Sequence, residues 1–146
     1  MEIHVVCIVI LSAIVLSCHA QLTDEMKAHF KQQIAECKNT EDANDDDVTR
    51  FLAGDKPTTL KGKCLISCMQ EAFGLTKGGQ VQREGARKLG QMLFGNNDEV
   101  LSVLEIVRAE CASLTDPDRC EASYKRMSCA KTVAEKHGLK TPREMI

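Results

Sequence analysis

The segment Lys61–Met69, KGKCLISCM, carries two of the chain's eight cysteines, Cys64 and Cys68. These two are four residues apart, so on a helix they lie on the same face with their Cβ atoms about 6 Å apart. A disulfide needs about 3.8 Å between the two Cβ atoms. Cys64 and Cys68 are therefore not expected to bond to each other, and each is expected to join this helix to a different element of the fold.

The N-terminal end has the pattern of a secretory signal peptide. Val5–Leu16 is an almost wholly apolar run, which is too short to cross a bilayer because a crossing takes about 20 apolar residues. Small residues at Cys18 and Ala20 indicate cleavage before Gln21. We therefore expect residues 1–20 to be removed and the remaining chain to be secreted into extracellular fluid.

The remaining segment, residues 21–146, is expected to form one domain with three disulfides. Cys7 and Cys18 leave with the signal peptide, and the six cysteines that remain are an even number in an oxidising route. A zinc site is the alternative, but the chain has no Cys-x-x-Cys pair. The net charge of -2 argues against a nucleic-acid-binding protein, because phosphate binding needs a basic field.

Helix geometry restricts a second pair of cysteines as well. Cys120 and Cys129 are nine residues apart, which places them half a turn out of phase, on opposite sides of one helix. They too need separate partners. Six cysteines can pair in fifteen ways, and the two exclusions leave ten of those pairings open.

The apolar pattern over residues 21–146 predicts an all-α fold. Apolar side chains recur every three or four residues, as on one face of a helix, and no stretch alternates convincingly as a strand does. Six helices are expected, over about residues 22–37, 45–53, 57–74, 81–95, 99–114 and 117–137, with a loop at Gly78-Gly79. The helix at 99–114 is apolar nearly all round, so we expect it to be central and buried on most sides.

Several helix starts carry capping residues. Thr23 and Asp24 supply cap chemistry at the start of the first helix, and Asn97 or Asp98 caps the fifth. Asp116 is the expected cap of the sixth helix, because Pro117 follows it in the first turn.

Three further features have two readings each. Glu41–Asp47 lacks the turn glycine and final glutamate of a calcium loop, so we interpret it as a solvated acidic loop with helix-start chemistry. His29 and His137 could act as pH sensors, although His137 is better explained as a favourable charge at a helix C-terminus. The tail Leu139–Ile146 either folds over a pocket mouth or frays into solvent.

The cysteine spacing resembles that of the insect odorant-binding proteins. The pattern is C-x26-C-x3-C-x42-C-x8-C-x8-C, and its x3 and final x8 gaps are the most specific parts. Gly62-Lys63 before the second cysteine, Glu121-Ala122 after the fifth and Lys136–Leu139 near the end support the resemblance. It covers the whole of residues 21–146, and it is a resemblance to the six-cysteine pheromone and general odorant-binding family.

This resemblance implies a compact six-helix domain around an internal apolar cavity. It also implies three interlocked disulfides, Cys37–Cys68, Cys64–Cys120 and Cys111–Cys129, a pairing that is among the ten left open. A chain of about 126 residues builds an adequate core without such crosslinks. A hollow interior loses burial energy, and three disulfides, each worth about 2–4 kcal/mol, would offset that loss.

The predicted ligand site consists of apolar residues in excess of those that helix packing needs. Tyr124 carries the chain's only phenol and is the expected hydrogen-bonding group for a ligand carbonyl or hydroxyl. The alternative is that these residues are simply core. The predicted lining is Met69, Phe73, Leu75, Leu89, Met92, Leu93, Phe94, Leu104, Val107, Tyr124 and Met127.

No catalytic motif is recognisable, so we expect no enzyme activity, cofactor or metal. The expected partner is a small hydrophobic ligand: an odorant, a pheromone or a lipid-like molecule. The resemblance implies a membrane chemoreceptor as a further partner and sensillum lymph as a location. It also implies that the protein is a monomer or a weak homodimer. A saposin-like membrane-active or defence protein is the alternative, but it would open with Cys-x-x-Cys, and the small negative charge disfavours anionic lipid and stable membrane insertion.

Overall fold

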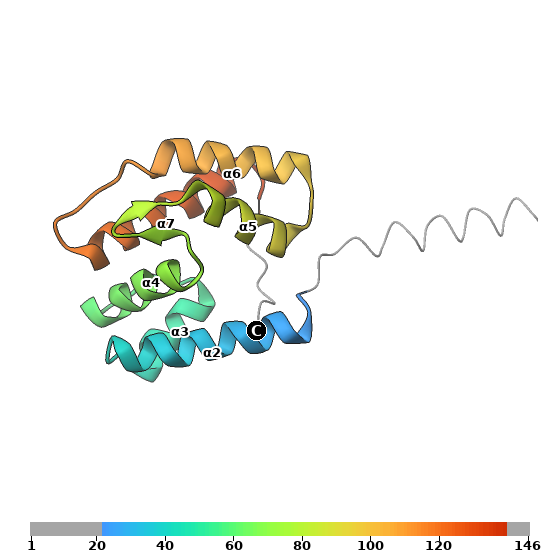
Figure 1. Ribbon diagram of the computed structural model, residues 1–146. Coiled ribbons are helices and arrows are strands. Elements are labelled where there is room, and N and C mark those ends of the chain that lie inside the picture. Colours follow the sequence, from blue (N-terminus) through green and yellow to red (C-terminus); the bar gives the residue numbers. More distant parts are fainter. Residues whose placement is uncertain (1–21, 140–146) are drawn as a thin grey trace, which may run out of the picture.

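The structure is a computed structural model that describes residues 22–139 (Figure 1). The predicted signal peptide and its cleavage site lie outside the described residues, as does the tail from residue 140 onward.

The described chain is built from six α-helices and one short hairpin. The predicted all-α class is confirmed, and the hairpin between two-residue strands was not expected. Its strands pair antiparallel around Gly78 and Gly79, whose φ angles of 57° and 78° suit a tight two-residue turn. The elements are α2 (Asp24–Thr40), α3 (Asp45–Ala53), α4 (Leu60–Ala72), β1 (Thr76–Lys77), β2 (Gln80–Val81), α5 (Arg83–Phe94), α6 (Asp98–Cys111) and α7 (Arg119–Lys136).

Local sequence sets most of the helix starts. Thr23 caps α2 and Asn97 caps α6, and each is one of the two residues expected at that start. The predicted cap of α7 is wrong, because Asp118 rather than Asp116 accepts hydrogen bonds from the first free N–H groups of the helix. The extended backbone of Asp118 brings its carboxylate over these groups. The start of α4 also lies later than expected, after the cap Thr59.

The acidic stretch before α3 contains a buried carboxylate. Asp47 is 2% exposed and forms a capping box with Asn44, in which each side chain accepts a hydrogen bond from the other's backbone N–H. Its second oxygen accepts from the Thr59 hydroxyl at 2.6 Å. Helix-start chemistry is therefore confirmed, but Asp47 is not solvated as predicted, because it ties the start of α3 to the start of α4.

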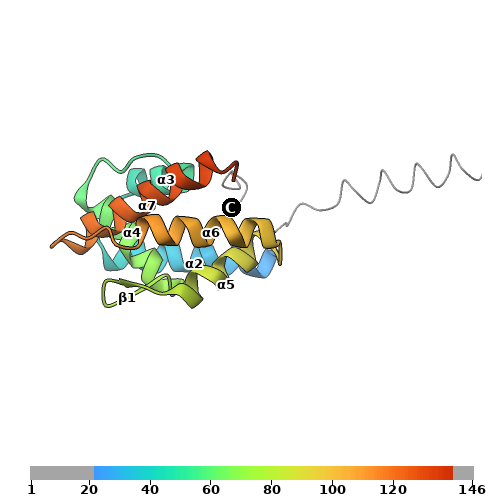
Figure 2. The ribbon, with the colours of Figure 1, turned by 90° about the horizontal axis from the view of Figure 1, so that it is seen from above.

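Helix α4 occupies the centre of the fold. In Figure 1 it lies between α6 along the top and α2 along the bottom, and it packs against α2, α3 and α7. The prediction that α6 is central is wrong. Helix α6 packs against α5 and α7. It runs along the top of the molecule in Figure 1, and seen from above it lies in front of α2 (Figure 2). Of its residues only Cys111 is buried, and Ile106 is 37% exposed.

The packed core lies between α2, α3 and α4. Leu65 is fully buried at its centre, with Ile34 from α2 and Met69 from α4 beside it. Phenylalanines at 30, 51 and 73 close this cluster from its edges. The core of the molecule is therefore at one end, and not under the most apolar helix.

Candidate ligand-binding site

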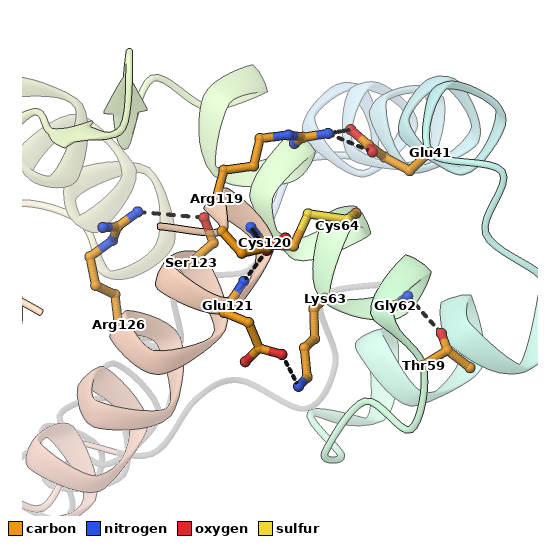
Figure 3. Close-up of a disulfide and its surroundings, with 11 residues drawn as sticks. Glu41, Thr59, Gly62, Lys63, Cys64, Arg119, Cys120, Glu121, Ser123 and Arg126 are labelled. Atoms are coloured by element: carbon orange, nitrogen blue, oxygen red, sulfur yellow. Dashed lines mark hydrogen bonds and ion pairs between the residues drawn. A yellow bond between two sulfur atoms is a disulfide. The ribbon is translucent and has the colours of Figure 1, made fainter. Parts of the chain in front are cut away.

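Three disulfides fix the helices that surround the candidate site. The pairing is the one that the family resemblance implies, and it satisfies both geometric exclusions. It joins α2 to α4, α4 to α7, and α6 to α7, with Cα atoms 5.6, 4.5 and 5.8 Å apart in Cys37–Cys68, Cys64–Cys120 and Cys111–Cys129. Figure 3 shows the central bond, Cys64–Cys120, with the polar groups around it.

Tyr124 lies beside a charged pair next to this central disulfide. Lys63 of α4 forms an ion pair with Glu121 of α7 (Figure 3), and its ammonium lies 5.3 Å from the centroid of the Tyr124 ring. Tyr124 is five residues before Cys129, so it lies about 140° around α7 from the residue that bonds α6. The structure thus places the phenol on the α4 side of α7.

Two of the predicted ligand residues belong to the packed core. Met69 is 3% exposed, and Phe73 packs against the same cluster. The Phe73 ring centroid is 5.5 Å from that of Phe30 and 6.0 Å from that of His29, both on α2. At this end of α4 the predicted lining is therefore shared with core packing.

The remaining predicted residues are half-buried. Helix α5 buries only Gly90 and α6 buries only Cys111. The two helices touch closely at one point, since a Cβ added to Gly90 would lie 2.2 Å from Leu104 Cδ1. The half-buried set is Leu75, Leu89, Met92, Leu93, Phe94, Leu104, Val107, Tyr124 and Met127.

Two polar clefts were not predicted from the sequence, and none of the predicted ligand residues lines either of them. One, of about 680 Å³, lies beside the α3–α4 connection and is lined by residues such as Lys56 and Leu60. The other, of about 450 Å³, lies between α4, the hairpin, residues 115–117 and α7. The available signal was Ser123 and Arg126, two polar residues three apart on one face of α7 between two cysteines.

Arg126 is the most unusual group in the second cleft. It is 7% exposed. Its guanidinium donates to the Leu114 carbonyl at 3.2 Å and to Ser123 Oγ at 3.5 Å (Figure 3). Its buried Nε has no hydrogen-bond acceptor within residues 22–139. Burial lowers the pKa of Arg126. By contrast, the nearby Asp116 is paired with Lys125, and that hydrogen bond, followed by one from the Asp118 N–H, lowers the pKa of Asp116.

The described residues offer no metal cluster or membrane-spanning helix. Within residues 22–139, no three His, Cys, Asp or Glu side chains gather closely enough to hold a metal ion. Over the same range no helix combines the length and apolar character that a bilayer crossing requires. The six cysteines of this range are all in disulfides, so none of them is a free thiolate nucleophile.

Comparison with known proteins identifies the family. General odorant-binding protein 28a of Drosophila melanogaster is 30% identical over 137 residues, which span 90% of this chain and 96% of that protein. The solved odorant-binding protein dmelOBP28a of the same fly is similar with a TM-score of 0.67 and 27% identity, covering 77% of this chain and 95% of the other. A fatty acid binding protein, OBP56a, from the oral disk of the blowfly Phormia regina matches with a TM-score of 0.68 and 25% identity, covering 80% and 97%. The PBP/GOBP family model matches residues 19–133, and the chain therefore belongs to the PBP/GOBP family, that of the insect pheromone-binding and general odorant-binding proteins.

Proposed function

We propose that the protein is a secreted carrier that binds a small hydrophobic molecule against the apolar side chains of α5, α6 and α7. The observation that carries the proposal is burial: nine of the eleven predicted ligand residues lie outside the packed core and are only half-buried. Membership of the PBP/GOBP family supports it. The similar blowfly protein is described as a fatty acid binding protein, which suggests a lipid-like ligand here.

The physical reason is the apolar surface that the helices leave in contact with water. Each Å² of apolar surface removed from water contributes about 25 cal/mol to binding. A ligand that covers these side chains is therefore bound by burial of apolar surface, and no chemical reaction is needed. The apolar side chains of α5 and α6, called here the α5–α6 face, include several Leu and one Met at position 92. Met is flexible and adapts to ligands of several shapes. The Cys111–Cys129 bond supports this face by attaching α6 to α7.

A fluorescence titration with N-phenyl-1-naphthylamine tests the proposal. The wild-type protein should bind this probe saturably, and palmitate should displace it. Leu93→Gln and Leu104→Gln should each weaken probe binding about tenfold, because burying a Leu side chain is worth about 1.5–3 kcal/mol. The matched control is Ile106→Gln on α6, since Ile106 is already 37% exposed, and it should change the affinity little.

Two outcomes would contradict the carrier. The carrier function is contradicted if the folded protein does not take up the probe saturably. It is also contradicted if Leu104→Gln and Ile106→Gln weaken probe binding equally. Leakage of liposomes without saturable probe binding would favour the saposin-like alternative. Secretion is tested separately, by N-terminal sequencing of protein from the culture medium, where the expected first residue is Gln21.

A further inference from the structure

The cleft of about 450 Å³ beside the hairpin gathers most of the buried polar side chains of the described chain. Five polar or charged side chains are buried within residues 22–139, and four of them line this cleft: Ser67, Thr76, Ser123 and Arg126. The fifth, Asp47, is in the helix-capping network described above. A buried polar group is costly unless it has a partner, so this concentration of polar groups needs an explanation.

Within the described residues, Arg126 has no anionic partner. No Asp or Glu oxygen in residues 22–139 lies within ion-pair distance of its guanidinium. The acceptors it has are a carbonyl and a hydroxyl, both uncharged, and its Nε has none. An arginine stays charged even when buried. The cleft is therefore lined by a positive charge that no acidic group within residues 22–139 neutralises.

The other charged groups of the cleft determine which anion fits. Arg119 is held by both oxygens of Glu41 at 2.7 Å, and Asp116 is held by Lys125 at 2.6 Å. Glu71, an exposed residue at the rim, forms no ion pair within the described chain. One buried cation with one carboxylate at the rim favours a singly charged ligand over a dianion such as phosphate.

We propose that this cleft is a second binding site, separate from the α5–α6 face, that binds a small monocarboxylate on the Arg126 guanidinium. Arg126 lines the cleft, and its planar guanidinium matches the two oxygens of a carboxylate. The hydroxyls of Ser67 and Thr76 line the same cleft and supply further donors. The ligand is either a free short-chain acid or the head group of a longer fatty acid.

Binding is measured by calorimetry and by the ¹H–¹⁵N resonance of the Arg126 Nε–H group. Sodium butyrate is the short-chain probe, palmitate the long-chain probe and inorganic phosphate the dianion. We expect saturable butyrate binding, a shift of the Nε–H resonance on binding, and weaker binding of phosphate. Arg126→Met should weaken butyrate binding about tenfold or more, because charge-assisted hydrogen bonds are lost.

Glu71→Gln provides a test in the opposite direction. Glu71 is exposed, so its substitution leaves the fold intact and removes a negative charge near the bound carboxylate. Butyrate should then bind about two- to fivefold more tightly. If Arg126→Met fails to fold, Glu71→Gln and the Nε–H resonance still decide the proposal.

The apolar variant Leu93→Gln separates this site from the proposed carrier site. It should weaken binding of the naphthylamine probe and leave butyrate binding unchanged. Saturable palmitate binding that shifts the Nε–H resonance, with no butyrate binding, would assign the site to a fatty-acid head group. The proposal is overturned if neither butyrate nor palmitate binds, or if neither acid shifts the Nε–H resonance. Weaker butyrate binding in Glu71→Gln would overturn it as well.

Discussion

The two ends of this molecule are packed in different ways. Between α2, α3 and α4, Leu65 and Met69 are almost fully buried within a cluster closed by phenylalanines. At the α5–α6 end each helix buries a single residue, Gly90 or Cys111, although both helices are rich in apolar side chains.

The two ends differ in how far their apolar side chains are buried within the protein itself. Close packing at the α2–α4 end removes apolar surface from water within the protein itself, which stabilises the fold. At the α5–α6 end the same kind of side chain is only half-buried, and under the proposed function the remaining gain from burial is available to a ligand. The α5–α6 end is held by the Cys111–Cys129 disulfide and by surface pairs, more than by a core of its own.

The largest expected effect comes from truncating one leucine at each end. Leu65→Ala should lower the free energy of unfolding by about 2–5 kcal/mol, because it leaves a cavity in a closed core. Leu93→Ala should cost about 1 kcal/mol or less without ligand, since Leu93 is half-buried. Denaturant unfolding with the disulfides intact measures both. Equal losses would show that the two ends are packed alike.

Removing single disulfides should give the next effect. The double variant Cys111→Ser/Cys129→Ser loses a crosslink over 18 residues, worth about 3 kcal/mol, and its probe affinity should fall because α6 is no longer attached to α7. Cys37→Ser/Cys68→Ser is the matched control, because the core cluster still holds α2 on α4. It should lose stability but keep its probe affinity while folded. Probe binding that survives equally in both variants would contradict this account.

Two glycines of α5 should respond differently to the same substitution. A Cβ on Gly85 would lie 1.8 Å from the Gly74 carbonyl oxygen, a backbone atom that cannot move aside cheaply, so Gly85→Ala should cost about 2 kcal/mol. A Cβ on Gly90 would clash with Leu104 Cδ1, the far end of a flexible side chain, and would be in ordinary contact with Leu101. Alanine gains about 1 kcal/mol in helix propensity. Gly90→Ala should therefore be near neutral in thermal unfolding. A larger loss at Gly90 would indicate tighter α5–α6 packing than the exposures suggest.

The smallest effect concerns a surface pair that links α5 to α6. Glu105 accepts hydrogen bonds from Arg83 and Arg108, both at 3.1 Å, and these, Arg83 first, lower the pKa of Glu105 below its ordinary 4.5. The stabilisation is therefore present above pH 4.5 and is lost as the pH falls through the lowered value. Glu105→Gln should lower the melting temperature slightly at pH 7 in low salt and not at all in strong acid. A difference that grows below pH 4 would contradict this assignment.

Much of the fold could be predicted because its signals are local. Thr23, Asn97 and the apolar period of each helix depend on residues within one or two turns. The spacing of Cys64 and Cys68 excluded a bond between them by helix geometry alone. Local patterns were insufficient where a distant element competes: Asp47 is buried because Thr59, twelve residues later, donates to it.

The candidate sites depended on tertiary structure to different degrees. The apolar residues of α5 and α6 could be selected from the sequence, but Met69 and Phe73 belong with the α2–α4 core. The polar cleft could not be found in this way, since its residues come from α4, the hairpin, the loop before α7 and α7 itself. The spacing of Ser123 and Arg126 marks one face of α7 as polar, but it does not indicate that the Arg126 Nε is buried without an acceptor from residues 22–139.

By itself, the sequence determined the helical class, the presence of six helices and the spacing of the cysteines that marks the PBP/GOBP family, because each is a pattern along the chain. Tertiary structure decided which helix is central. Apolar character on all sides of residues 99–114 permits a buried helix, but burial depends on how many neighbours surround it, and the disulfides place α4 between α2 and α7. The same arrangement leaves α5 and α6 half-covered and encloses Arg126 without an acidic partner from residues 22–139.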